Sequence, residues 1–141
     1  MQVGMWCGYV TFGLVADRFG RKRAYVTYLL AAAALVPLYA RTREPGALLV
    51  LGPLVAFFGT GYFSGFGAVT AEIFPTSVRA TAQGLTYNLG RGVSALAPVM
   101  VGSVAGLRGL STALALTSLA YLIAAGLWFW IPETRGRTLP D

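Results

Sequence analysis

Long apolar runs separated by short polar turns dominate this sequence. Of its 141 residues, 56% are hydrophobic and only 11% are charged, and the mean hydropathy is +0.65. A helix needs about twenty apolar residues to cross the roughly 30 Å of hydrocarbon in a bilayer. Such a composition is typical of a polytopic membrane protein. We therefore expect an all-α helical bundle whose first partner is the lipid bilayer, forming a single transmembrane domain over residues 1–141.

Five segments are apolar enough to be predicted as membrane spans, and the turns between them are short. The segments are residues 1–16, 24–40, 47–71, 83–104 and 112–131. The first is shorter than the roughly twenty residues that a full span requires. The fourth is the least regular, because it is interrupted by Gly84, Gly90, Gly92 and Pro98. Short connections between long helices predict antiparallel neighbours in one bundle.

The turn between the first two spans is strongly basic. Residues 13–23, G-L-V-A-D-R-F-G-R-K-R, hold four of the eleven basic residues. Lys and Arg beside a span resist translocation, which predicts that loop 17–23 is cytoplasmic. By alternation, loop 72–82 and the C-terminal tail after Pro132 are then also cytoplasmic in a multi-pass protein of the cell membrane. The net charge of +6 thus reflects topology, and no nucleic-acid partner is expected.

The residue inventory argues against catalysis and metal binding. The chain has no histidine and only one cysteine, so histidine chemistry, an internal disulfide and the usual zinc sites are excluded. No nucleophile and base are paired within the apolar segments. We expect no enzyme activity, no metal and no cofactor.

Several motifs resemble those of one transporter family. The pattern G-x-x-x-D-R-x-G-R-K-R resembles the cytoplasmic-loop signature of the major facilitator superfamily, and E-x-F-P-T-x-x-R-A-T followed by Y-N-x-G-R resembles its eleventh-helix region. P-E-T-R-G-R-T-L resembles the sugar-porter signature after the twelfth helix. This order implies that the chain corresponds to part of the eighth helix through the C-terminal tail. The first seven helices, and with them the N-terminal half that would be its partner, are expected to be absent.

The resemblance also implies a function. Members of this family are secondary active transporters that work by alternating access between two halves. The solute is expected to be a small organic molecule, either a sugar or an organic anion such as a carboxylate. If transport is coupled to protons, as in a symporter, the titrating carboxylate is expected in the absent half. The alternative is a non-transporting membrane subunit or regulator derived from a transporter, and this chain alone is not expected to transport.

Charged residues at the cytoplasmic ends of the helices form a predicted gate network. Its members are Asp17, Arg18, Arg21, Glu72, Arg79 and Glu133. The resemblance to sugar porters implies that such residues latch the cytoplasmic gate in one state, and ion pairs made in one state only do bias a two-state equilibrium. The alternative is a set of solvated topology determinants, each pair contributing less than about 1 kcal/mol.

Arg91 is the one basic residue predicted inside a span. If that span enters the membrane at Gln83, eight residues place Arg91 roughly 12 Å deep. Intramembrane charges usually mark a substrate or ion path. Tyr87, Arg91 and Ser94 share one helix face, and the guanidinium offers two donors to a carboxylate. The alternatives are snorkelling of Arg91 toward the headgroups and a structural bond to backbone carbonyls.

Two further residues complete the predicted substrate site. Asn88 belongs to the Y-N-x-G-R motif, which resembles the eleventh helix of organic-anion transporters that also carry an arginine at this point. Tyr62 lies on an aromatic stripe of the third span, which either walls a cavity or simply packs.

Glycines and one proline are predicted to shape the helix contacts. Gly61 and Gly65 form a G-x-x-x-G pattern that allows close approach of another helix, and Gly13 is expected to act similarly near the first turn. Pro98 is expected to interrupt the fourth span. Flexing of these helices during gating is the alternative to simple packing.

Overall fold

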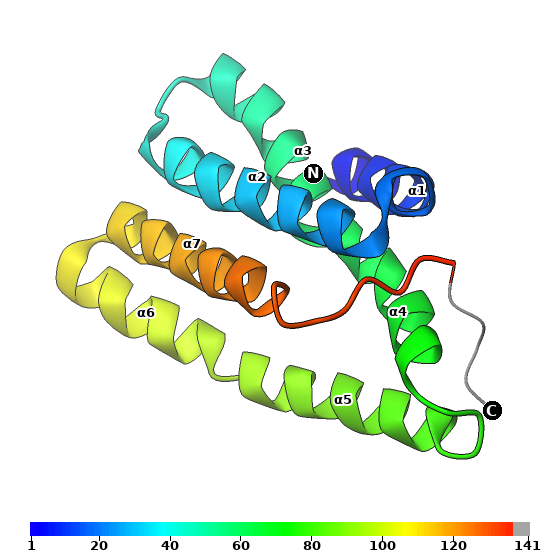
Figure 1. Ribbon diagram of the computed structural model, residues 1–141. Coiled ribbons are helices and arrows are strands. Elements are labelled where there is room, and N and C mark those ends of the chain that lie inside the picture. Colours follow the sequence, from blue (N-terminus) through cyan, green and yellow to red (C-terminus); the bar gives the residue numbers. More distant parts are fainter. Residues whose placement is uncertain (137–141) are drawn as a thin grey trace.

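The computed structural model describes residues 1–136, which form a helical bundle with no strand among them (Figure 1). The elements are α1 (Gln2–Phe19), α2 (Arg21–Arg41), α3 (Pro45–Gly61), the 3₁₀ segment η1 (Tyr62–Gly65), α4 (Phe66–Ile73), α5 (Arg79–Ser94), α6 (Ala97–Arg108) and α7 (Leu110–Leu127). The all-α prediction is confirmed. The end of the P-E-T-R-G-R-T-L motif, residues 137–139, lies outside the described residues.

These elements make five rods, as predicted, because α3, η1 and α4 run on as one rod and α5 and α6 as another. Among the described residues, four rods are long and apolar enough to span a membrane: Arg21–Arg41, Pro45–Ile73, Arg79–Arg108 and Leu110–Leu127. Helix α1 is not one of them, since Gln2, Asp17 and Arg18 lower its mean hydropathy.

Close contact between α1 and α3 is built on glycines. Gly4 and Gly8 of α1 are buried so tightly that an added Cβ at either would collide with the backbone of α3, at Pro53 or Phe57. An added Cβ at Gly61 would in turn lie 2.8 Å from the carbonyl oxygen of Gly8. Small residues at helix contacts permit this approach.

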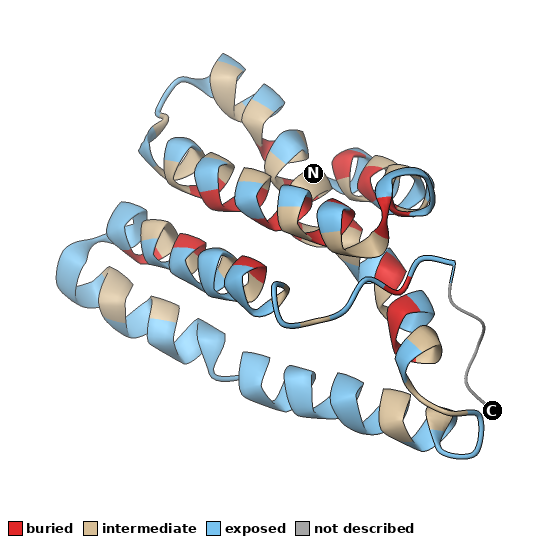
Figure 2. Cartoon of the chain, in the orientation of Figure 1, coloured by how far each residue is buried: buried red, intermediate tan, exposed pale blue. Residues whose placement is uncertain are grey.

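Aromatic rings fill the space between α1, α2 and α3. Phe12 is fully buried and meets the rings of Tyr25 and Tyr28 edge to face, at centroid distances of 4.8 and 5.0 Å. Tyr25 also stacks on Trp128 at 3.9 Å, which joins the end of α7 to the same core. Figure 2 shows that buried positions concentrate on α1 and α2 and are absent from α5 and α6.

The predicted loop 17–23 is almost entirely helical. Helix α1 continues to Phe19 and α2 begins at Arg21, so Gly20 alone joins them. Gly20 has a φ of 104°, a conformation that residues with a side chain rarely adopt. The basic residues therefore sit on two helix ends rather than on a flexible loop.

The third predicted span contains a break that its apolar pattern does not reveal. The α-helix ends at Gly61, four residues follow as the 3₁₀ turn η1, and α4 continues to Ile73. The tighter turn brings residues three apart onto one side. Gly65 is held against the ring of Phe12, and an added Cβ there would lie 2.9 Å from the hydroxyl of Tyr25.

The fourth and fifth spans differ from their predicted limits. The fourth begins at Arg79, ends at Arg108 and is divided at residues 95–96. Pro98 lies in the first turn of α6, where its missing N–H costs nothing. Helix α7 ends at Leu127, four residues before the predicted end at residue 131, and residues 128–130 form a turn.

We predict that Gly61→Ala destabilises the protein because its methyl group would press on the backbone of Gly8. Overpacking of this kind typically costs about 1–3 kcal/mol. Gly102→Ala in α6 is the matched control, since nothing lies within 4 Å of its added Cβ. Thermal unfolding of purified protein in detergent should show a lower midpoint for Gly61→Ala only. Equal midpoints would mean that the α1–α3 contact is not close in the membrane protein.

Candidate functional site

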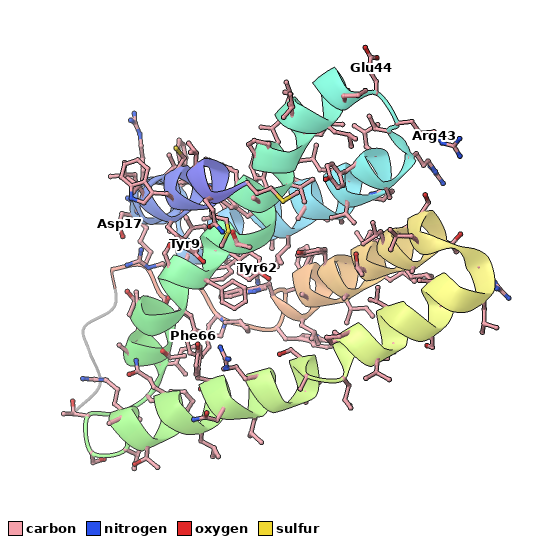
Figure 3. All side chains as sticks on the ribbon, turned by 180° about the vertical axis from the view of Figure 1, so that it is seen from behind. Tyr9, Asp17, Arg43, Glu44, Tyr62 and Phe66 are labelled. Atoms are coloured by element: carbon pink, nitrogen blue, oxygen red, sulfur yellow. The ribbon has the colours of Figure 1, made fainter. Side chains whose placement is uncertain are left out.

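An aromatic groove lies where α1, η1, α4 and α5 meet. Its volume is about 570 Å³, and it is lined by Tyr9, Phe63, Ser64, Phe66, Gly67, Tyr87 and Arg91. In Figure 3, Phe66 lies below Tyr9 and above α5, which runs along the bottom of the view. We refer to this feature as the Arg91 groove.

Two of its walls come from the 3₁₀ turn η1 and from the first residue of α4. Phe63 and Phe66 are three residues apart, so the tight turn brings both to the groove. The hydroxyl oxygen of Ser64 lies 3.1 Å from the carbonyl oxygen of Tyr9 and 3.0 Å from that of Gly61. Ser64 therefore ties η1 to α1.

Arg91 and Tyr87 form the third wall on α5. Nη1 of Arg91 donates to the hydroxyl of Tyr87 at 3.3 Å, and the guanidinium carbon lies 5.6 Å from the Tyr87 ring centroid. The Tyr87 ring is 6.0 Å from that of Phe66 on α4. Gln83 holds α5 in place by donating to the hydroxyl of Thr70, at 2.9 Å, and to the carbonyl of Gly67, at 3.0 Å.

Only part of the predicted substrate site lies in this groove. Tyr87 and Arg91 line it, as the shared helix face predicts. Ser94 instead donates to the carbonyl of Arg91 at 2.9 Å, and Asn88 donates to the carbonyl of Gly84 at 2.8 Å. Neither residue is among the groove's lining, and neither is Tyr62. Both short polar side chains bond to their own helix because a carbonyl three or four residues back is within reach.

Five lining residues were not among the predicted site residues: Tyr9, Phe63, Ser64, Phe66 and Gly67. Tyr9 belongs to a helix whose glycine contacts decide which face meets η1, and these contacts are long-range. Phe63 and Ser64 depend on the 3₁₀ turn. The available signal was the pair Gly61 and Gly65, which brackets that turn.

Tyr62 lines two other apolar pockets, and the first of them shares Phe63 and Phe66 with the Arg91 groove. Their volumes are about 420 and 430 Å³, and both are lined by Tyr62 and Ala124. The first also contains Tyr25, whose buried hydroxyl has no hydrogen-bond partner among the described residues. The second lies between α6 and α7.

Four of the six predicted gate residues meet at one end of the bundle. Nη2 of Arg21 donates to Oε1 of Glu72 at 3.0 Å, and the side chains are only 16% and 14% exposed. Arg21 also forms an ion pair with Asp17. Glu133 accepts the backbone N–H groups of Arg21 and Lys22, at 2.8 and 3.2 Å, and so caps the N-terminus of α2.

The remaining two residues of the predicted network have other contacts. Nε of Arg79 donates to the carbonyl of Phe74 at 3.2 Å, across the connection between α4 and α5. The guanidinium of Arg18 lies 5.8 Å from the Phe19 ring centroid, and within the described part of the chain it makes no ion pair.

The two ends of the bundle are distinct. The contacts of Arg21 with Glu72 and Glu133 place the first basic turn, the end of α4 and the tail together. At the other end, Ser111 donates to the carbonyl of Ala40 at 2.8 Å. Figure 3 shows Arg43 and Glu44 at that end, far from Asp17.

The Glu133 contact predicts a dependence on pH. Burial alone would raise the pKa of Glu133, but the backbone N–H groups of Arg135, Arg21 and Lys22 outweigh it and lower the pKa below its usual 4.5. A lowered pKa means that the contact is fully stabilising above the pKa of the unfolded state. It is lost as the pH falls through the lowered value. Spin labels introduced by Arg23→Cys and Arg135→Cys in a Cys7→Ser background should therefore separate on acidification, since both positions keep the backbone N–H groups of the contact.

Glu133→Gln should remove this acid-dependent separation, since an amide does not titrate. Glu44→Gln, at the opposite end of the bundle, is the control and should leave it unchanged. An unchanged label distance in acid, with Glu133 intact, would contradict the capping role of this carboxylate.

Comparison with known proteins agrees with this architecture. Residues 1–141 match the Major Facilitator Superfamily. A protein of Haemophilus influenzae named for metabolite transport is 39% identical over 137 residues, which are 96% of this chain and 34% of that protein. A protein of Cupriavidus pinatubonensis named for 4-methylmuconolactone transport is 33% identical over 138 residues, 96% of this chain and 32% of its own length.

A third relative, the cis,cis-muconate transport protein of Acinetobacter baylyi, is 31% identical over 122 residues, 84% of this chain and 29% of its own length. The chain thus spans about a third of the length of these relatives. The apolar helices and the relatives together indicate a multi-pass membrane protein of a transporter class. The chain belongs to the Major Facilitator Superfamily.

Proposed function

We propose that this chain is the C-terminal part of a secondary transporter that carries a small organic anion by alternating access, with Arg91 binding the carboxylate of the solute. The observation that carries the proposal is the position of Arg91 in the groove between α1, η1, α4 and α5. A planar guanidinium can donate two parallel hydrogen bonds to a carboxylate.

The charge distribution supports an anionic solute. The carboxylates of the described residues are Asp17, Glu44, Glu72 and Glu133, and none of them lines the Arg91 groove. Within the described chain Arg91 makes no ion pair, and Tyr87 is its side-chain partner. A charge inside a span is costly unless it is satisfied or used. A solute carboxylate would satisfy it.

The names of the relatives favour an organic acid over a sugar. One relative is named for cis,cis-muconate, which is a dicarboxylate, and another for 4-methylmuconolactone. The groove offers few hydroxyl or amide groups, which a sugar would require in number.

In the proposed transporter, the cluster of Asp17, Arg21 and Glu72 belongs to the cytoplasmic gate. Basic residues on the helix ends 17–23 favour that side of the membrane, and loop 72–82 and the tail lie at the same end. Ion pairs that are made in one transport state and broken in the other would bias the equilibrium between states. Arg18 is available to the rest of the protein for such a pair.

The remainder of the transporter is proposed to cover α5 and α6. These helices contain no buried residue, although many of their side chains are large and apolar, among them Leu89, Val99 and Met100. A rod of 30 residues without a buried residue needs further partners within the membrane or between the halves of a transporter. Relatives about three times as long have the chain to supply them.

The test is substitution of Arg91 in the full-length transporter that contains this chain. We predict that Arg91→Lys weakens binding of the transported acid and that Arg91→Gln weakens it further. Lysine keeps the charge but loses the two-donor fork, whereas glutamine loses the charge. Loss of a charged hydrogen bond is expected to reduce affinity by about ten- to a hundredfold.

Neutral analogues are the control, because they should bind the variants almost as they bind the unaltered protein. Calorimetric titration in detergent measures the binding affinity of both classes of ligand. Equal losses for acids and neutral analogues would make Arg91 a structural residue, and no loss for either would exclude it from the solute site.

A further inference from the structure

We infer that the Arg91 groove selects a planar, conjugated carboxylate, such as an aromatic acid, over a saturated acid of the same charge and similar size. The inference rests on the proposed function and specifies its substrate class. It concerns the walls of the groove, whereas the proposed function concerns its charge.

Four aromatic rings line the groove around a single charge. They come from four elements: Tyr9 from α1, Phe63 from η1, Phe66 from α4 and Tyr87 from α5. Three of them are substantially exposed, with 38% of Tyr9, 54% of Phe63 and 46% of Tyr87 accessible. Aromatic side chains usually bury most of their surface. These residues keep accessible surface, and part of it lines the groove.

The rings are arranged so that a flat ligand can contact them. The planes of Phe66 and Tyr87 are inclined at 51°, with their centroids 6.0 Å apart. Aromatic groups attract one another in offset or edge-to-face arrangements of this kind. A conjugated skeleton has the complementary faces and edges, whereas a puckered saturated ring has only aliphatic C–H groups to offer.

The single cation orients such a ligand. Among residues 1–136, Arg91 is the only charged residue that lines the groove, and its guanidinium is already next to the Tyr87 ring. A carboxylate bound to Arg91 leaves the rest of the solute to the uncharged lining. Apart from Gly67, that lining consists of the four rings and Ser64. Arg91 thus binds the carboxylate, and the rings contact the flat skeleton.

The test compares benzoate with cyclohexanecarboxylate, which have the same carbon count and the same charge. We expect the full-length transporter to bind benzoate about fivefold more tightly, as measured by calorimetric titration in detergent. Phe63→Leu and Phe66→Leu keep an apolar side chain but remove a ring. Each should weaken binding of benzoate more than binding of cyclohexanecarboxylate, and so reduce the preference toward unity.

Phe19→Leu is the matched control, because Phe19 is exposed at the end of α1 and does not line the groove. It should retain the full preference. Equal binding of the two acids by the unaltered transporter, or binding of neither, would overturn the inference. So would an undiminished preference in both leucine variants.

The Arg91 variants separate this failure from failure of the proposed function. If Arg91→Gln weakens both acids while neither is preferred, the carboxylate site stands and only its selectivity for flat ligands is wrong. If Arg91→Gln leaves both acids unaffected, the proposed function fails as well.

Discussion

The contact between α1 and α3 positions both the aromatic core and one wall of the Arg91 groove. Gly4, Gly8 and Gly61 bring the two backbones together so closely that an added methyl group would collide. With α1 fixed, Tyr9 stands beside the 3₁₀ turn and Ser64 can bond to its carbonyl. The same contact buries Phe12, around which Tyr25 and Tyr28 pack. One side of the rod formed by α3, η1 and α4 thus faces the aromatic core, and the adjoining side lines the groove.

Charge is distributed to suit this packing. Arg21, Glu72 and Glu133 meet at one end of the bundle, where partial exposure and backbone donors satisfy them. Arg91 departs from this arrangement because it lies well inside its rod, next to Tyr87 rather than a carboxylate. The gate and the solute site that we propose are therefore separated along the helices. Their physical requirements also differ, since the gate needs pairs that can break and the solute site needs a charge left for the ligand.

Sequence patterns predicted the parts of this structure that depend on local chemistry. The apolar runs predicted the five rods, and the motifs predicted the family. The motifs also predicted that charged residues, Arg21 and Glu72 among them, gather at one end of the bundle. The spacing of Tyr87 and Arg91 placed both on one face. Ser94, which the same spacing predicted, and Asn88, which the motif predicted, do not line the groove, because their side chains bond to carbonyls of their own helix. Tyr9, Phe63 and Ser64 could not be found, because their position depends on a 3₁₀ turn held by long-range glycine packing.

Cysteine accessibility along α5 tests the central claim most directly, namely that one face of this helix forms a solute groove. In a Cys7→Ser background of the full-length transporter, Tyr87→Cys and Arg91→Cys should react with a water-soluble thiol reagent. Leu85→Cys and Leu89→Cys lie on the opposite face, about 200° away by helical rotation, and should react slowly. Benzoate should protect Tyr87→Cys, where Arg91 is intact. Uniform reactivity around the helix, or faster reaction at positions 85 and 89, would contradict the account.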